Sequence, residues 1–129
     1  SSLLAGLNAT VRSKPKDPSV YFKRANYYLM NGNLVEALSD YNRAIALDSG
    51  LIKAFNNRGV VRRRLSDLIG ALADYSAVIR LNPRDSDAYQ NRGIVKEQMG
   101  RLSAACSDWG VAAGLGAAEA KEWISKQCQ

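Results

Sequence analysis

The stretch "NNRG", Asn56–Gly59, lies within a segment that otherwise has the apolar spacing of a helix and contains no proline. A glycine inside a helix costs about 1 kcal/mol relative to alanine, so its presence requires a structural reason. The letters "NRG" return 34 positions later at Asn91–Gly93, and the small residue Ala25 stands 34 positions before Gly59. A small residue that returns at a fixed interval indicates that another helix passes close by.

The interval of 34 residues holds in seven columns of the sequence, each filled three times by residues of one kind. The columns are Tyr21, Phe55 and Tyr89; Ala25, Gly59 and Gly93; Leu34, Leu68 and Leu102; Ala37, Ala71 and Ala105; Asp40, Asp74 and Asp108; Tyr41, Tyr75 and Trp109; and Leu47, Leu81 and Leu115. Columns that stay in register over three copies predict one supersecondary unit stacked into a solenoid.

Each copy is predicted to contain two helices separated by a polar or glycine-containing break. The first helices are expected at 19–30, 53–65 and 87–99, and the second helices at 34–47, 68–81 and 102–113. The small residue of the first helix is expected to pack against the aromatic residue of the second. We therefore interpret Gly59 as a device that allows two helices to approach closely.

This pattern resembles the tetratricopeptide repeat, a helix-turn-helix unit of 34 residues with small and aromatic residues at set positions. The second copy matches the family at Phe55, Gly59, Ala71, Tyr75, Val78 and Pro83. The first and third copies match at Tyr21, Ala25, Tyr28, Ala37, Tyr41 and Ala44, and at Tyr89, Gly93, Ala105, Trp109 and Ala112. Arg62 and Lys96 stand where the family favours tyrosine, and we expect their stems to pack while their charged heads reach solvent.

The resemblance implies an all-α, right-handed α-solenoid that forms a single domain over residues 1–129. The predicted division is an N-terminal partial-repeat helix in 1–17, repeats in 18–51, 52–85 and 86–118, and a capping helix in 119–129. Leu7 and Thr10 are in register with the second helices, which places the partial repeat. Trp123 and Ile124 supply an apolar stripe for the cap.

Composition argues against several classes of function. The 129-residue chain has 18 basic and 12 acidic residues, a formal net charge of +6, which favours an acidic partner. It has no histidine, which is the commonest general base and metal ligand, and no glycine-rich phosphate-binding loop. Two cysteines alone cannot complete a zinc site. We therefore predict no enzymatic activity, no cofactor and no metal.

Two sets of arginines are candidate binding residues. Arg24, Arg58 and Arg92 each precede a repeated aspartate by 16 residues, which favours ion pairs between packed helices over a row that binds an acidic ligand. Arg62, Arg63 and Arg64 are consecutive, so on a helix they point about 100° apart and form no flat basic face. The aromatic residues lie in packing columns, so bases would lack a stacking platform, and nucleic-acid binding is disfavoured.

The resemblance further implies a concave groove, lined by the first helices, that binds an extended peptide or a helix of a partner protein. The predicted lining residues are Phe22, Lys23, Asn26 and Met30; Lys53, Asn56, Asn57, Val60 and Arg64; and Gln90, Asn91 and Ile94. Ser19, Asp87 and Gln98 share these helical faces, since they continue the same spacing. The basic side chains favour an acidic ligand here, and the competing interpretation is a generic solvated face.

One subfamily binds the C-terminal carboxylate of chaperone tails through asparagines and basic residues. Asn26 and Asn57 match those asparagines, but Phe22, Asp87 and Asn91 stand where basic residues would be, so chaperone-tail binding is not predicted. Two rival hypotheses of function stay open beside peptide binding. One is a basic helical repeat that binds RNA, and the second is a structural segment of a longer array.

Cys106 and Cys128 form a disulfide in one interpretation and remain reduced thiols in the other. Cys106 shares a helix face with Trp109, and Cys128 follows Ile124 by one helical turn, so a folded-back cap would bring the sulfurs together. No apolar run reaches the ~18 residues of a membrane span. The default expectation is a soluble cytoplasmic protein, or one in an oxidising compartment if the cysteines are bridged.

Overall fold

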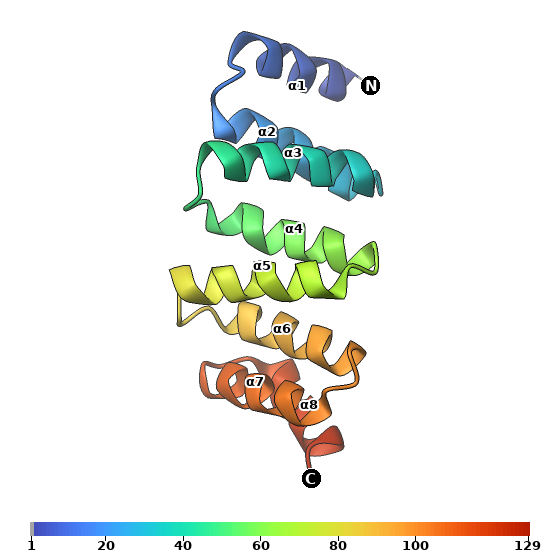
Figure 1. The fold of residues 1–129 in the computed structure, drawn as a ribbon, viewed down its shortest axis with the longest axis vertical. Coiled ribbons are helices and arrows are strands. Elements are labelled where there is room, and N and C mark those ends of the chain that lie inside the picture. The colour runs from blue at the N-terminus through green and yellow to red at the C-terminus, as the bar shows by residue number, and fades with distance from the viewer. Residues whose placement is uncertain (1) are drawn as a thin grey trace.

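The computed structural model describes residues 2–129, which form eight α-helices and no strands. The helices are α1 (Ser2–Ser13), α2 (Pro18–Met30), α3 (Leu34–Leu47), α4 (Ile52–Arg64), α5 (Leu68–Leu81), α6 (Ser86–Gln98), α7 (Leu102–Gly114) and α8 (Ala118–Gln127). They stack in chain order into an elongated column with the two termini at opposite ends (Figure 1). The chain is therefore an all-α solenoid.

The predicted bounds of the six repeat helices are confirmed to within one residue at each end. Local signals explain this agreement, because the side chains of Asp17, Asp67 and Asp85 accept hydrogen bonds from backbone N–H groups in the first turns of α2, α5 and α6. Among the described residues, no helix is long and apolar enough to cross a membrane. The segment predicted to hold the N-terminal partial-repeat helix, 1–17, begins at Ser1, which lies outside the described residues.

The small residues of α4 and α6 face large rings, as predicted. A Cβ atom added at Gly59 would lie 2.9 Å from Cε1 of Tyr75, closer than carbon atoms pack. A Cβ atom added at Gly93 would overlap the indole of Trp109. Both rings are almost completely buried in α5 and α7. The helical glycines therefore make room for aromatic side chains of the following helix.

The three predicted arginine–aspartate pairs are confirmed. Each aspartate is at least 95% buried, and the closest nitrogen–oxygen distances are 2.7–2.8 Å, between Arg24 and Asp40, Arg58 and Asp74, and Arg92 and Asp108. The hydrogen bonds to Asp40 and Asp108 raise the pKa of Arg24 and Arg92.

Each of these arginines also donates to the helix before its own. The acceptors are Asn8, Asn42 and Ser76, which stand 16 residues before the respective arginine. Each guanidinium thus joins three consecutive helices. This second contact was not predicted from the sequence, although its acceptors recur at the same 34-residue interval.

The prediction that Arg62 and Lys96 send their charged heads to solvent is wrong. Nη1 of Arg62 lies 3.2 Å from Oδ1 of Asp74, and Nζ of Lys96 lies 2.9 Å from Oδ2 of Asp108. Both side chains therefore give a second cation to an aspartate that is already paired. The buried carboxylates attract them because burial without such partners is costly.

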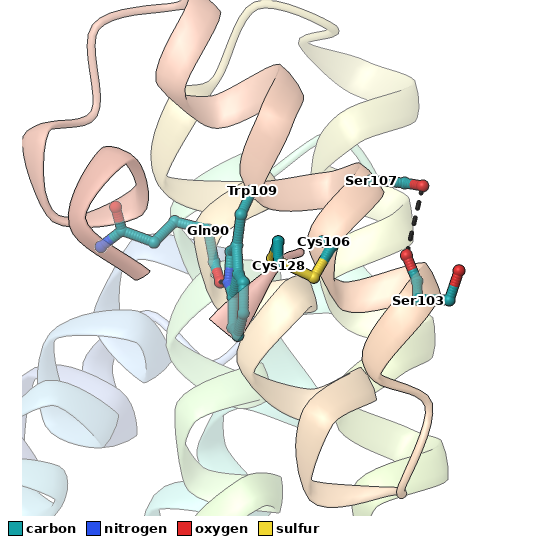
Figure 2. Close-up of a disulfide and its surroundings, with 6 residues drawn as sticks. All are labelled: Gln90, Ser103, Cys106, Ser107, Trp109 and Cys128. Atoms are coloured by element: carbon teal, nitrogen blue, oxygen red, sulfur yellow. Dashed lines mark hydrogen bonds between the residues drawn. A yellow bond between two sulfur atoms is a disulfide. The ribbon is translucent and has the colours of Figure 1, made fainter. Parts of the chain in front are cut away.

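The last helix packs against α7 at the C-terminal end of the solenoid. Ala120 of α8 is fully buried, and the ring of Trp123 lies 5.4 Å from that of Trp109 between centroids. Cys106 of α7 and Cys128, which directly follows α8, are joined by a disulfide beside Trp109 (Figure 2). The C-terminal helix is therefore held by both apolar packing and a covalent link.

Candidate functional site

The residues predicted to line a groove belong to α2, α4 and α6, the first helix of each pair. Equivalent positions form rows across these three helices, which we call the groove rows: 19, 53 and 87; 23, 57 and 91; 26, 60 and 94; and 30, 64 and 98. Lys23, Met30, Lys53 and Arg64 are exposed, and the remaining predicted lining residues are partly buried. Three of these four exposed side chains are cations.

A small pocket lies within the first two groove rows, between α4 and α6. Its volume is about 170 Å³, and its lining residues are Ile52, Lys53, Asn56, Asn57, Asp85 and Asp87. Three of the predicted lining residues, Lys53, Asn56 and Asn57, are therefore brought together around one concavity. The pocket does not include the other predicted residues, which are Phe22, Lys23, Asn26, Met30, Val60, Arg64, Gln90, Asn91 and Ile94.

Asp85 is a pocket residue that the sequence reasoning missed. Its side chain accepts a hydrogen bond from the backbone N–H of Ala88 at 3.1 Å, so it caps α6 as well as lining the pocket. A signal was present in the sequence, because Asp85 stands two residues before Asp87, where the first helix of the third copy is predicted to begin. A residue just before a helix lies close to the side chains of the first turn of that helix.

Two asparagines of the groove rows are joined by a hydrogen bond. Nδ2 of Asn57 on α4 donates to Oδ1 of Asn26 on α2 at 3.0 Å, and the hydroxyl of Tyr41 donates to the same oxygen. Asn26 therefore has a structural role, because its oxygen accepts the hydrogen bond of the buried Tyr41 hydroxyl. Burial raises the pKa of Tyr41 to about 12, and the neighbouring Asn57 opposes this increase.

This amide network ends at the second repeat copy. Val60 occupies the groove row of Asn26 but has no polar group, and it packs with Leu72 and Met99 against the cluster that contains Tyr75. The fully buried hydroxyl of Tyr75 has no hydrogen-bond partner among the described residues. Burial raises the pKa of Tyr75, and the charge of Arg63 partly offsets this effect.

Two further predicted lining residues have contacts within the fold. The ring of Phe22 lies 6.1 Å from that of Tyr41 between centroids, so Phe22 belongs largely to the core. The backbone carbonyl of Gln90 accepts a hydrogen bond from Nε1 of Trp109 at 3.3 Å. These positions therefore support the groove helices in addition to any contact with a ligand.

A second pocket lies beside the disulfide, at the C-terminal end. It has a volume of about 270 Å³ and is lined by Leu102, Ser103, Cys106, Gln127, Cys128 and Gln129. No group of three or more acidic, histidine or cysteine side chains within residues 2–129 is arranged to hold a metal ion. The charged side chains of the first pocket offer the richer chemistry.

Comparison with known proteins identifies the fold and one repeat. The family model described as the tetratricopeptide repeat matches residues 18–51. No curated protein sequence matches the chain. The crystal structure of the MamA protein is similar with a TM-score of 0.82 at 22% identity, over 98% of this chain and 66% of that chain. The present chain thus spans about two thirds of the length of that relative.

Two smaller structures are similar over most of their length. The first tetratricopeptide repeat domain of Spaghetti (RPAP3), solved with the HSP90 peptide SRMEEVD, has a TM-score of 0.80 at 24% identity, over 85% of this chain and 89% of that chain. The tetratricopeptide repeat domain of Arabidopsis OM64 has a TM-score of 0.80 at 21% identity, over 85% and 93%. The chain thus contains one matched tetratricopeptide repeat at residues 18–51 and shares its helical fold with these structures over most of its length.

Proposed function

We propose that this protein is an interaction scaffold that binds a peptide or helix of a partner protein along the groove rows of α2, α4 and α6. Tetratricopeptide repeats generally mediate protein–protein interaction, and one similar domain was solved with a bound peptide. The observation that carries the proposal is the pocket of about 170 Å³ that gathers Lys53, Asn56 and Asn57. Its chemistry suits a peptide backbone.

The two pocket asparagines provide the backbone contacts. An asparagine side chain has two N–H donors and an acceptor oxygen, so it can bind the N–H and C=O groups of an extended chain. Nδ2 of Asn56 donates a long hydrogen bond of 3.4 Å to Oδ1 of Asn57, and Nδ2 of Asn57 donates to Asn26. Neither amide is saturated by these bonds, because each Nδ2 has a second N–H and each oxygen can accept more than one hydrogen bond.

Binding of nucleic acid is the weaker candidate. Five of the cations, Arg24, Arg58, Arg62, Arg92 and Lys96, are paired with the three buried aspartates. Phosphate groups would have to compete with those carboxylates for the same nitrogen atoms. The net charge of +6 therefore overstates the positive surface that is free to contact a nucleic acid.

The proposal is tested by charge reversal in the groove. A peptide selected on the full chain from a random display library is titrated against the wild type and Lys53→Glu/Arg64→Glu. Both residues are exposed on α4, so the fold is expected to survive the substitutions. The affinity for the peptide is expected to fall by about tenfold or more.

A matched control distinguishes local from diffuse attraction. Arg80→Glu/Lys121→Glu makes the same change in net charge on α5 and α8, outside the groove rows. Arg43, which is exposed on α3, is a poorer choice because its guanidinium lies 5.7 Å from the centre of the Tyr21 ring. Equal effects of the two double variants would contradict binding in the groove.

A further inference from the structure

The first groove row changes charge from helix to helix. Ser19 of α2, Lys53 of α4 and Asp87 of α6 occupy equivalent positions and are all exposed. The row therefore runs from neutral to positive to negative. A ligand that follows the row meets these side chains in order, because equivalent residues of stacked repeats share one face.

The pocket between α4 and α6 brings the two signs together. Lys53 comes from α4, and Asp85 and Asp87 come from the start of α6. Asp85 is partly satisfied by its hydrogen bond to Ala88, whereas Asp87 makes no hydrogen bond or ion pair within residues 2–129. Lys53 makes no ion pair over the same residues. The pocket thus presents a cation and a carboxylate that the fold itself leaves uncompensated.

Two further exposed cations, on α4 and α2, do not change where the sign of the charge reverses. Arg64, the exposed cation in the last groove row, adds a second positive charge to α4. On α2, the exposed Lys23 lies close enough to the carboxylate of Asp17 to contribute to the lowered pKa of Asp17, which is due mainly to hydrogen bonds from Ser19. The clear change of sign is therefore between α4 and α6, where the pocket lies.

We infer that the bound segment is of mixed charge, with an acidic side chain that pairs with Lys53 and a basic side chain that pairs with Asp87. This inference rests on the proposed function, since it concerns the same groove. A uniformly acidic segment would set negative charge against Asp85 and Asp87, and like charges across an interface oppose binding. A uniformly basic segment would meet Lys53 and Arg64 in the same way.

The test begins with the random display library, selected on the full chain at about 0.05 M salt so that exposed charges are weakly screened. Peptides of roughly 12 residues extend to about 40 Å, enough to cross neighbouring helices. We expect the enriched peptides to carry an acidic and a basic residue at a constant separation.

A charge swap then tests whether the basic side chain of the peptide pairs with Asp87. Asp87→Lys is expected to weaken a mixed-charge peptide by about tenfold, and replacing the basic residue of that peptide by glutamate is expected to restore binding. Glu36→Lys is the matched control, because it makes the same charge change at an exposed site on α3 and should leave both affinities unchanged. Asp87→Asn provides a milder variant if the reversal perturbs α6.

Two results would overturn the inference, and only the second would also overturn the proposed function. Enriched peptides that are uniformly acidic, depend on Lys53 and are unaffected by Asp87→Lys would refute the mixed-charge partner and leave the proposed function intact. A selection without enriched peptides, or peptides equally bound by Lys53→Glu, would refute both.

Discussion

At the scale of single residues, the helical glycines show how a locally unfavourable residue is selected by packing. Gly59 and Gly93 cost helix stability, but the rings of Tyr75 and Trp109 occupy the volume that a side chain would need. Ala25 stands at the equivalent position in α2 and is fully buried in the cluster that contains Tyr41. The same position therefore holds alanine where the ring leaves room for a methyl group.

Replacing Gly59 by leucine is expected to destabilise the protein by about 1–3 kcal/mol, because the side chain would be forced into the Tyr75 ring. Thermal melts followed by circular dichroism measure this change. Gly110→Leu is the matched control, since Gly110 lies exposed within α7 and a Cβ atom there meets nothing within 4 Å. Equal midpoints for Gly59→Leu and the wild type would contradict the packing role.

The two buried tyrosines are expected to respond differently when their hydroxyls are removed. Tyr41→Phe loses the hydrogen bond to Asn26 and should cost about 1 kcal/mol, whereas Tyr75→Phe removes an unpaired hydroxyl and should be neutral or stabilising. Denaturant titrations of both variants measure the difference. A loss of stability in Tyr75→Phe as large as in Tyr41→Phe would show that Tyr75 has a partner.

The pKa of Tyr41 adds a dependence on pH. Its value in the fold is about 12, against 10.0 for an ordinary tyrosine, so below pH 10 both the folded and the unfolded states hold the proton. Between about pH 10 and 12 the unfolded state loses the proton first, and stability is lost as pH rises. Tyr41→Phe should decline less steeply over this window, and an unchanged decline would refute the assignment.

At the scale of helices, the agreement between sequence and structure follows the range of the interactions. Helix bounds depend on local caps and turns, and those of the six repeat helices were predicted to within one residue. Ser66, at φ 64°, takes the backbone conformation that Gly32 and Gly100 take at the equivalent turns. The turn was predictable from its place in the copy, although serine rarely adopts this conformation.

The contacts that were missed join different copies or different helices. Asn26 and Asn57 are separated by 31 residues, and the 34-residue pattern does not show that their side chains meet. The heads of Arg62 and Lys96 were placed wrongly because a family preference for tyrosine says nothing about a buried carboxylate nearby. Asp85 was absent from the predicted lining residues because it lies outside the predicted first helix of the third copy, although it stands only two residues from Asp87.

The disulfide is expected to stabilise the packing of α8 on α7. Reduction of the bond between Cys106 and Cys128, which are 22 residues apart, should lower stability by about 3 kcal/mol and increase hydrogen exchange in α8 first. Cys106→Ala/Cys128→Ala should match the reduced protein and be insensitive to reductant. Identical melting midpoints with and without reductant would contradict this role.

At the scale of the whole molecule, repeated arginines tie the solenoid together along its length. Each of Arg24, Arg58 and Arg92 contacts an aspartate on the next helix and a polar side chain on the previous one. Stability in such a stack is approximately a sum over neighbouring units. The same contacts fix the order of α2, α4 and α6 along the stack, and the groove rows are defined on these three helices.

The central claim is that a partner segment binds along the groove rows, and backbone amide chemical-shift mapping with a selected peptide tests it most directly. Titration of the peptide into isotope-labelled protein is expected to shift signals mainly from α2, α4 and α6, with the largest changes around Lys53, Asn57 and Asp87. Shifts confined to the outward faces of α3, α5 and α7, with the pocket signals unmoved, would contradict the account.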